Sequence, residues 1–197
     1  MRVPALRTAT YLAFIMPVFF SLIWIMSATI DGKWAFGVNS LSDMGISENA
    51  VSAFLFNFGC IMTGLFGSMI GFGMYAYGKK TVRAGGLFYI ISMIFLALVG
   101  VFTLNIFPMH FTVASTFGVM FAVSVVTTSV SDWKLSWYFY FDIIFMVAGT
   151  IVVVTQPFAV WEAIAVIGSM VWTVIIGYKM MKREEQLYGE TPRIGGI

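Results

Sequence analysis

The chain has 197 residues, of which 60% are hydrophobic and only 10% are charged. Soluble domains average about 25% charged residues, so this composition excludes an ordinary soluble fold and indicates a protein that lies in lipid. The net charge of +2 is small and its basic residues are scattered, which gives no support for nucleic-acid binding. A single cysteine, Cys60, excludes an intrachain disulfide and a cysteine-rich metal site.

Six long apolar runs follow one another along the chain. A spanning helix needs about 20 mostly apolar residues. Backbone groups in hydrocarbon must bond within their own segment, and the runs are continuous rather than alternating, so we predict helices and exclude a barrel. The predicted fold is an all-α bundle of six transmembrane helices in one domain, residues 1–180, followed by a short polar cytoplasmic tail, 181–197. The predicted spans are about 8–30, 50–77, 84–105, 109–130, 135–154 and 158–179.

The basic residues predict the orientation of the bundle. With the N-terminus inside, ten of the 11 Lys and Arg residues fall in inner segments, and only Lys33 falls in an outer one. The positive-inside rule therefore predicts a multi-pass protein of the cell membrane with both termini in the cytoplasm. The inner basic residues are Arg2, Arg7, Lys79, Lys80, Arg83, Lys134, Lys179, Lys182, Arg183 and Arg193.

The longest outer connection contains the polar stretch "NSLSDMGISEN", residues 39–49. It places Ser42, Asp43 and Glu48 between the first and second spans. The other outer connections, "NIFP" and "TQP", are very short. We therefore expect residues 39–49 to form the lid or rim of an outward-facing polar pocket.

His110 is the only histidine and follows Pro108 at the outer start of the fourth span. Ala114, Gly118 and Ala122 follow it at helical spacing. Small residues let helices approach closely, so this face is expected to point into the bundle. Two interpretations stay open: His110 pairs with Asp43 across the pocket, or it is a helix-start histidine bonded to a loop carbonyl.

Two asparagines lie near the outer ends of the second and third spans. Asn57 is followed by the pair Gly67 and Gly71, a GxxxG pattern that predicts close helix packing, and Asn57 is expected to bond a neighbouring helix. Asn105 is expected to cap or brace the turn before the fourth span. Both side chains are also candidates for the ligand-binding pocket.

Asp142 lies about two turns into the fifth span, and ionisable residues at membrane depth are costly. Gly149 and Thr150 share its helix face, which indicates the bundle interior. A structural pairing with Lys134 or Lys80 is one interpretation. A station on a proton or cation path is the other, and a small transporter or channel would use Asp142 together with Asn57.

The chain lacks most motifs of catalysis. One histidine is too few for a three-histidine zinc site, and neither a GxSxG elbow nor a glycine-rich phosphate loop is present, so we expect no metal and no cofactor. Ser42, Asp43 and His110 are the residue types of an acyl-transfer triad. An intramembrane lipid hydrolase or transferase with His110 and Asp43 therefore stays an alternative, although a non-enzymatic role is the favoured interpretation.

Two segments resemble an uncharacterised membrane family, common in archaea, that is known as domain of unknown function 998. They are "SLSDMGISENAVSAFLFNFGCIMTGL" and "GVFTLNIFPMHFTVAST", and the resemblance covers about residues 10–180. It implies a six-helix membrane protein and supplies no reaction. The shared elements are Ser42-Asp43-x-Gly45 after the first span, Asn57 in the second, and Pro108-x-His110 at the start of the fourth.

The Ser-Asp-x-Gly element is also similar to that of the eukaryotic Frag1/DRAM/Sfk1 membrane proteins, which are associated with lipid handling. This chain has "SENAV" where those proteins commonly have Pro-Glu. Together, the residues predict a pocket of Ser42, Asp43, Asn57, Asn105 and His110 that binds a lipid headgroup or a small polar ligand. The expected partners are membrane lipids, with a homo-oligomer or another membrane protein as further candidates.

Overall fold

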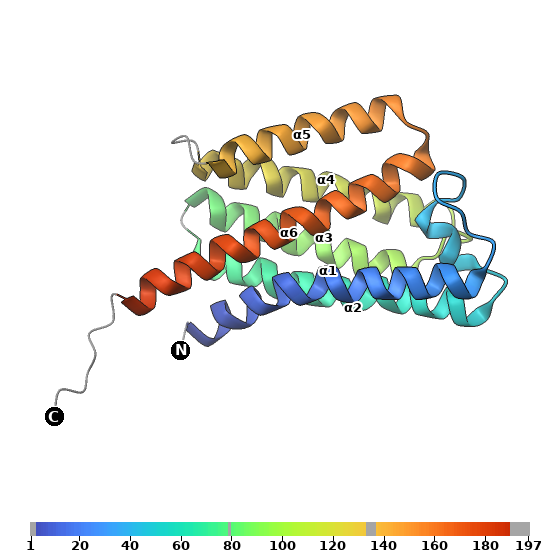
Figure 1. The fold of residues 1–197 in the computed structure, drawn as a ribbon, viewed down its shortest axis with the longest axis horizontal. Helices are drawn as coiled ribbons and strands as arrows, with labels where there is room; N and C mark the ends of the chain where they lie inside the picture. The colour runs from blue at the N-terminus through green and yellow to red at the C-terminus, as the bar shows by residue number, and fades with distance from the viewer. Residues whose placement is uncertain (1–2, 79, 133–136, 190–197) are drawn as a thin grey trace.

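A computed structural model describes residues 3–78, 80–132 and 137–189, and it contains helices and no strand within them. The six long helices form a single bundle, whose arrangement Figure 1 shows. Their bounds are α1 (Val3–Asp31), α2 (Ala50–Tyr77), α3 (Lys80–Val101), α4 (Met109–Ser129), α5 (Trp137–Thr155) and α6 (Phe158–Gly189). Two 3₁₀ helices, η1 (Leu41–Ile46) and η2 (Val130–Asp132), lie in the connections.

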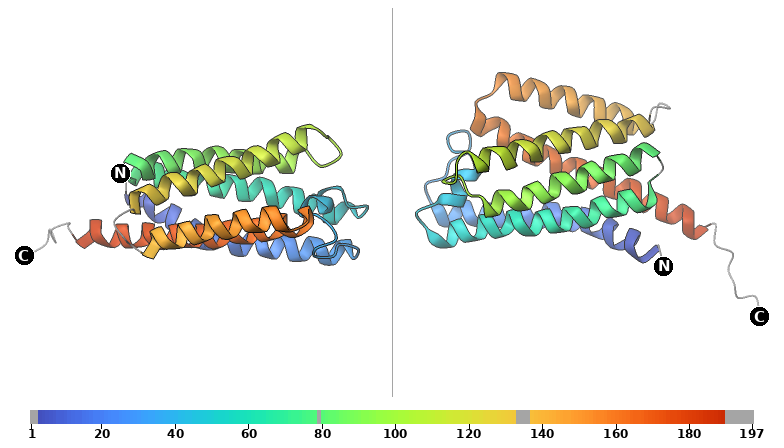
Figure 2. Two further views of the ribbon diagram at one scale, coloured as in Figure 1. Left: turned by 90° about the horizontal axis from the view of Figure 1, so that it is seen from above. Right: turned by 180° about the vertical axis from the view of Figure 1, so that it is seen from behind.

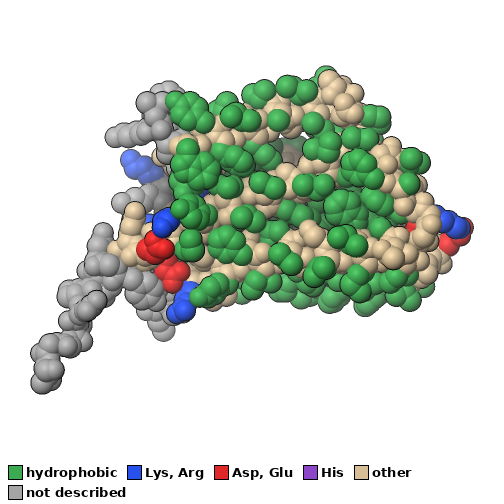
Figure 3. Space-filling view, viewed as in Figure 1, with side chains coloured by type: hydrophobic (Ala, Val, Ile, Leu, Met, Phe, Trp, Pro, Cys, Tyr) green, Lys and Arg blue, Asp and Glu red, His purple; other side chains and the backbone are tan. Residues whose placement is uncertain are grey.

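All six long helices are long and apolar enough to cross a membrane. Hydrophobic side chains cover the flank of the bundle in Figure 3, and the charged side chains of this view lie near its two ends. Away from its ends, such a helix bonds its backbone groups internally, which is what a hydrocarbon solvent requires. The prediction of an all-α, multi-pass membrane protein with six helices is therefore confirmed.

The helix ends differ from the expected spans mainly where polar residues continue a helix into water. α2 has the predicted bounds, whereas α3 begins at Lys80, four residues before the expected start. α6 continues to Gly189, so the first part of the expected tail is helical, because "MKREEQL" consists of good helix formers. Residues 190–197 of the expected tail lie outside the described residues.

Helices α1, α2, α3 and α4 pack side by side in chain order, and α6 packs on α1 (Figures 1 and 2). α5 lies against α4 and α6 with far less contact, and Asp142 is its only buried side chain. The connection between α1 and α2 lies at one end of the bundle, while the start of α1 and the end of α6 lie toward the other. We call the first of these the capped end and the second the terminal end.

The tightest interface joins α2 and α3 through glycines. A Cβ added at Gly71 would lie 2.7 Å from the Ile90 side chain and 3.0 Å from the Gly86 carbonyl oxygen, and one at Gly67 would collide with Met93. Small residues allow this backbone approach. The close packing predicted from the GxxxG pair is therefore confirmed.

Candidate functional site at the capped end

Residues 32–49 fold over the end of the bundle, and we call this segment the cap. The 3₁₀ helix η1 within it starts with a capping box. The Ser40 hydroxyl accepts from the Asp43 amide at 3.2 Å, and Asp43 Oδ2 accepts from the Ser40 amide at 2.7 Å. Such a box satisfies two amides that the helix start leaves unbonded. One oxygen of Asp43 therefore has a local structural role.

Glu162, in the second turn of α6, holds the cap onto the bundle. Its carboxylate accepts from the Leu41 amide at 2.6 Å and from the Ser42 hydroxyl at 3.0 Å. Glu162 is not among the residues that we singled out from the sequence. The signal that could have found it is the one that identified Asp142, namely an acidic residue inside an apolar span.

Gly45 and Asn57 form the second attachment of the cap. Asn57 Nδ2 donates to the Gly45 carbonyl at 2.9 Å, and a Cβ at position 45 would lie 2.6 Å from Asn57 Oδ1. A Cβ at this position would displace the Asn57 amide, so glycine preserves the contact. Ser42, Asp43 and Gly45 of the Ser-Asp-x-Gly element thus contact α6, their own turn and α2, respectively.

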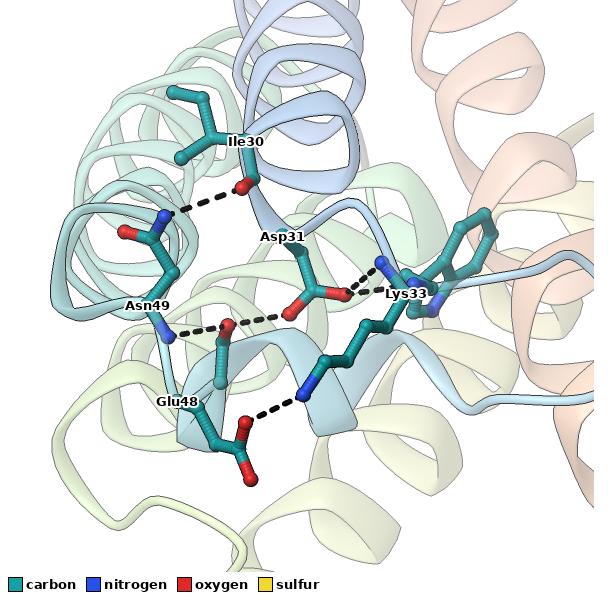
Figure 4. A network of polar contacts seen from close by, with 7 residues as sticks. Ile30, Asp31, Lys33, Glu48 and Asn49 are labelled. Atoms are coloured by element: carbon teal, nitrogen blue, oxygen red, sulfur yellow. Dashed lines mark hydrogen bonds and ion pairs between the residues drawn. The ribbon is translucent and has the colours of Figure 1, made fainter.

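Asp31 organises the start of the cap, as Figure 4 shows. Its carboxylate accepts from the amides of Lys33 and Trp34 at 3.0 and 2.6 Å and from the Ser47 hydroxyl. Both carboxylate oxygens are used, so this side chain fixes the path of the chain as it leaves α1.

An exposed ion pair closes the same network (Figure 4). Lys33 Nζ lies 2.5 Å from Glu48 Oε2, and the two side chains are 76% and 87% exposed. Each partner favours the charged form of the other, which raises the pKa of Lys33 and lowers the pKa of Glu48. Pairs this exposed add little stability, because water screens them.

A small pocket of about 140 Å³ lies between the end of α1 and the cap. Asp43 Oδ2 bonds Ser40, while no hydrogen bond to its other oxygen is found within the described part of the chain. The Trp34 indole donates to the Ser40 carbonyl at 2.8 Å, which fixes its ring beside the pocket. The pocket is lined by Asp31, Lys33, Trp34, Asn39, Asp43 and Met44.

His110 is buried, and its Nδ1 lies 2.7 Å from the Phe102 carbonyl oxygen just after α3. This geometry agrees with the interpretation as a helix-start histidine bonded to a loop carbonyl. The expected contact with Asp43 is not formed: both side chains are described, and no hydrogen bond or ion pair joins them. Asn105 accepts from the Thr103 hydroxyl at 2.5 Å, which braces the turn as expected.

The interior positions expected for His110 and Asp142 are confirmed, since their side chains are 6% and 2% exposed, but not every small residue used to predict them is packed. No described atom lies within 4 Å of a Cβ added at Gly118 or Gly149, and Thr150 is exposed. These small residues therefore do not mark a packed interior face. Glycine is common in transmembrane helices, so small size alone does not require a neighbouring helix.

Asp142 is 2% exposed and lies in the second turn of α5, a helix that begins at the terminal end of the bundle in Figure 1. Its two oxygens accept from the Trp172 indole at 2.9 Å and from the Ser129 hydroxyl at 3.0 Å. Donors from α4 and α6 thus meet at this carboxylate, which supports the interpretation as structural pairing. Of the lysines expected as its partners, Lys80 is exposed at the start of α3 and Lys134 lies outside the described residues.

Among the described residues, no group of three His, Cys, Asp or Glu side chains lies close enough to hold a metal ion. Over residues 14–179, the chain matches the sequence model of a family described as "Protein of unknown function (DUF998)". The matched region includes the cap, Glu162 and Asp142. No curated protein and no solved structure matches the chain.

Proposed function

We propose a function for this chain, which belongs to the DUF998 family of proteins of unknown function: it binds the headgroup of a membrane lipid, or another small polar molecule, in the pocket at its capped end. The observation that carries the proposal is the bonding of the two Asp43 carboxylate oxygens. One of its oxygens caps η1, and the other has no hydrogen bond within the described chain while the side chain lines a pocket.

The charges around the pocket favour a ligand that carries both signs. Asp43 offers an acceptor to an ammonium or hydroxyl donor, whereas both oxygens of Asp31 are already bonded. Lys33 offers a cation to a phosphate on the open side. Hydrogen bonds between ionised partners are the strong ones. A headgroup with a primary ammonium next to a phosphate, as in phosphatidylethanolamine, satisfies both residues.

The geometry gives less support to the two alternatives. A transport path through Asn57 and Asp142 would need a continuous route, yet Asn57 bonds the cap and Asp142 lies toward the opposite end of the bundle. An acyl-transfer triad would need His110 next to Ser42. The Ser42 hydroxyl instead donates to Glu162.

The test is retention of phosphatidylethanolamine by the purified protein in phosphatidylcholine nanodiscs, measured by native mass spectrometry. Phosphatidylcholine is the reference because its quaternary ammonium has no N–H donor. Asp43→Asn keeps an oxygen for the Ser40 amide and removes the charge. We expect it to lower retention about tenfold, which corresponds to about 1.4 kcal/mol for a charge-assisted hydrogen bond.

Glu185→Gln is the matched control, since it removes the same charge from an exposed side chain near the end of α6, which does not line the pocket. Its retention of phosphatidylethanolamine should stay close to that of the wild type. Equal retention by Asp43→Asn and the wild type would contradict the proposal.

A further inference from the structure

A second hollow lies on the outer flank of the bundle, between α1 and α6. It has a volume of about 380 Å³, within the size range of ligand sites. Pro17 and Met170 form its buried floor, and Val18, Leu22 and Val171 form an exposed rim. We call this hollow the groove.

The groove is closed on one side and open on the other. Toward the terminal end, α1 and α6 cross closely, because a Cβ added at Gly177 would lie 2.8 Å from the Ala13 side chain. Toward the capped end the two helices diverge (Figure 1). Ile25 on α1 and Ile164 on α6 are exposed in that direction. An occupant therefore enters from the capped side.

The depth of the groove matches the tail of a lipid whose head lies at the cap. Leu22 and Pro17 precede Asp31 by nine and 14 residues. At a rise of about 1.5 Å per residue, they lie roughly 14 and 21 Å below the pocket. Half of a bilayer's hydrocarbon core is about 15 Å thick. The groove therefore lies where the end of an acyl chain from the leaflet at the capped side would be.

The walls favour hydrocarbon as the occupant. Ser21 is the only hydroxyl residue that lines the groove, and it donates to the Met170 sulfur at 3.6 Å. A transmembrane helix is about 10 Å wide and runs the length of the bundle, so the Ala13–Gly177 crossing prevents it from entering. A single flexible chain has neither restriction.

We infer that the groove holds the end of one hydrocarbon chain of a lipid whose headgroup lies in the cap pocket. This inference rests on the proposed function and narrows it. The ligand is then an intact lipid of the leaflet at the capped side, and the polar pocket and the apolar groove are two parts of one site along α1.

The test uses phosphatidylethanolamine that carries a diazirine in the terminal half of one acyl chain, in phosphatidylcholine nanodiscs. After illumination, mass spectrometry locates the cross-links. We expect them on residues 17–22 and 167–174. Val18→Trp fills the groove and should lower this cross-linking at least fivefold. Val147→Trp on α5 is the matched control, since both valines are exposed, 60% and 55%, and the control lies outside the groove.

Two further measurements separate the inference from the proposed function. Asp43→Asn should also lower cross-linking in the groove, because it weakens the binding of the headgroup of the same lipid. Glycerophosphoethanolamine, which has the headgroup and no chains, should compete weakly with the labelled lipid.

Three other outcomes would contradict either the groove inference alone or the groove inference together with the proposed function. Retention that depends on Asp43, with cross-links spread evenly over the lipid-facing helices, would overturn the groove inference and leave the proposed function standing. Competition by glycerophosphoethanolamine as strong as that by the whole lipid would do the same. Cross-links in the groove that do not depend on Asp43 would overturn both, because the chain in the groove would then belong to a lipid with no head in the pocket.

Discussion

The two acidic side chains within the spans, Glu162 and Asp142, lie toward opposite ends of the bundle and differ in what they hold. Asp142 accepts from two side chains of neighbouring helices and is 2% exposed. Glu162 accepts from the Leu41 amide and the Ser42 hydroxyl of a connecting segment. A carboxylate in a membrane span is therefore not by itself a sign of transport. Here one joins helices and the other positions the cap.

The largest expected effect comes from Asp142. Asp142→Ala leaves the Trp172 indole without this acceptor, whereas the Ser129 hydroxyl keeps the Val125 carbonyl at 2.7 Å. An unsatisfied buried donor costs about 1–3 kcal/mol and a lost hydrogen bond about 1 kcal/mol, so the free energy of unfolding should fall by about 3 kcal/mol, measured by unfolding in detergent. Asp142→Asn, which keeps one acceptor oxygen, should lose less.

Ile144→Ala on the exposed face of α5 serves as the control and should change the stability little. An Asp142→Ala variant as stable as the wild type would contradict the structural role. It would return Asp142 to the candidates for a proton or cation path.

The second effect is local to the cap. Glu162→Ala removes the acceptor of the Leu41 amide, which is buried, and should cost about 2 kcal/mol. Hydrogen exchange should rise within residues 41–46 while α5 stays protected. Exchange that rises equally over the whole bundle would show that Glu162 and Asp142 do not differ as proposed.

A third prediction concerns the attachment of the cap to α2. Gly45→Ala forces a Cβ against Asn57 and should cost about 1–2 kcal/mol, as overpacking does. In the double variant Gly45→Ala with Asn57→Ala, the obstacle is gone, so the combined loss should be smaller than the sum of the two single losses. Gly118→Ala, with open space around its Cβ, should cost nothing. Additive losses at positions 45 and 57 would contradict the contact.

The sequence predicts the helices well and the contacts between distant segments poorly. Run length alone identifies α2, because a helix that spans lipid needs a run of about 20 mostly apolar residues. The bond from Ser42 to Glu162 joins residues 120 positions apart, and no pattern in either segment specifies the other. His110 is a second example, because a histidine side chain can bond either a carboxylate or the nearby Phe102 carbonyl. Only the path of the backbone decides between these partners.

The smallest expected effect on stability comes from the Lys33–Glu48 pair. A pH titration of Glu48 can detect this pair. Because the pKa of Glu48 is lowered in the folded protein, the contribution of the pair is present above the ordinary value of 4.5 and is lost as the pH falls through the lowered pKa. The raised pKa of Lys33 sets the upper pH limit of the pair's contribution to stability. The contribution is present below 10.5 and is lost as the pH rises through the raised pKa.

Carboxyl ¹³C NMR should therefore give Glu48 a midpoint below 4.5, and Lys33→Gln should move the midpoint back toward that value. Lys182→Gln, which removes the same charge on the last turns of α6, should leave the midpoint unchanged. Thermal stability should hardly respond to either change, because both partners at the cap are exposed and water already screens them. A Glu48 midpoint that is the same in the wild type and in Lys33→Gln would mean that the pair does not persist in solution. The cap would then be held by its other bonds, among them those to Asp31, Asn57 and Glu162, with Lys33 free to meet a phosphate.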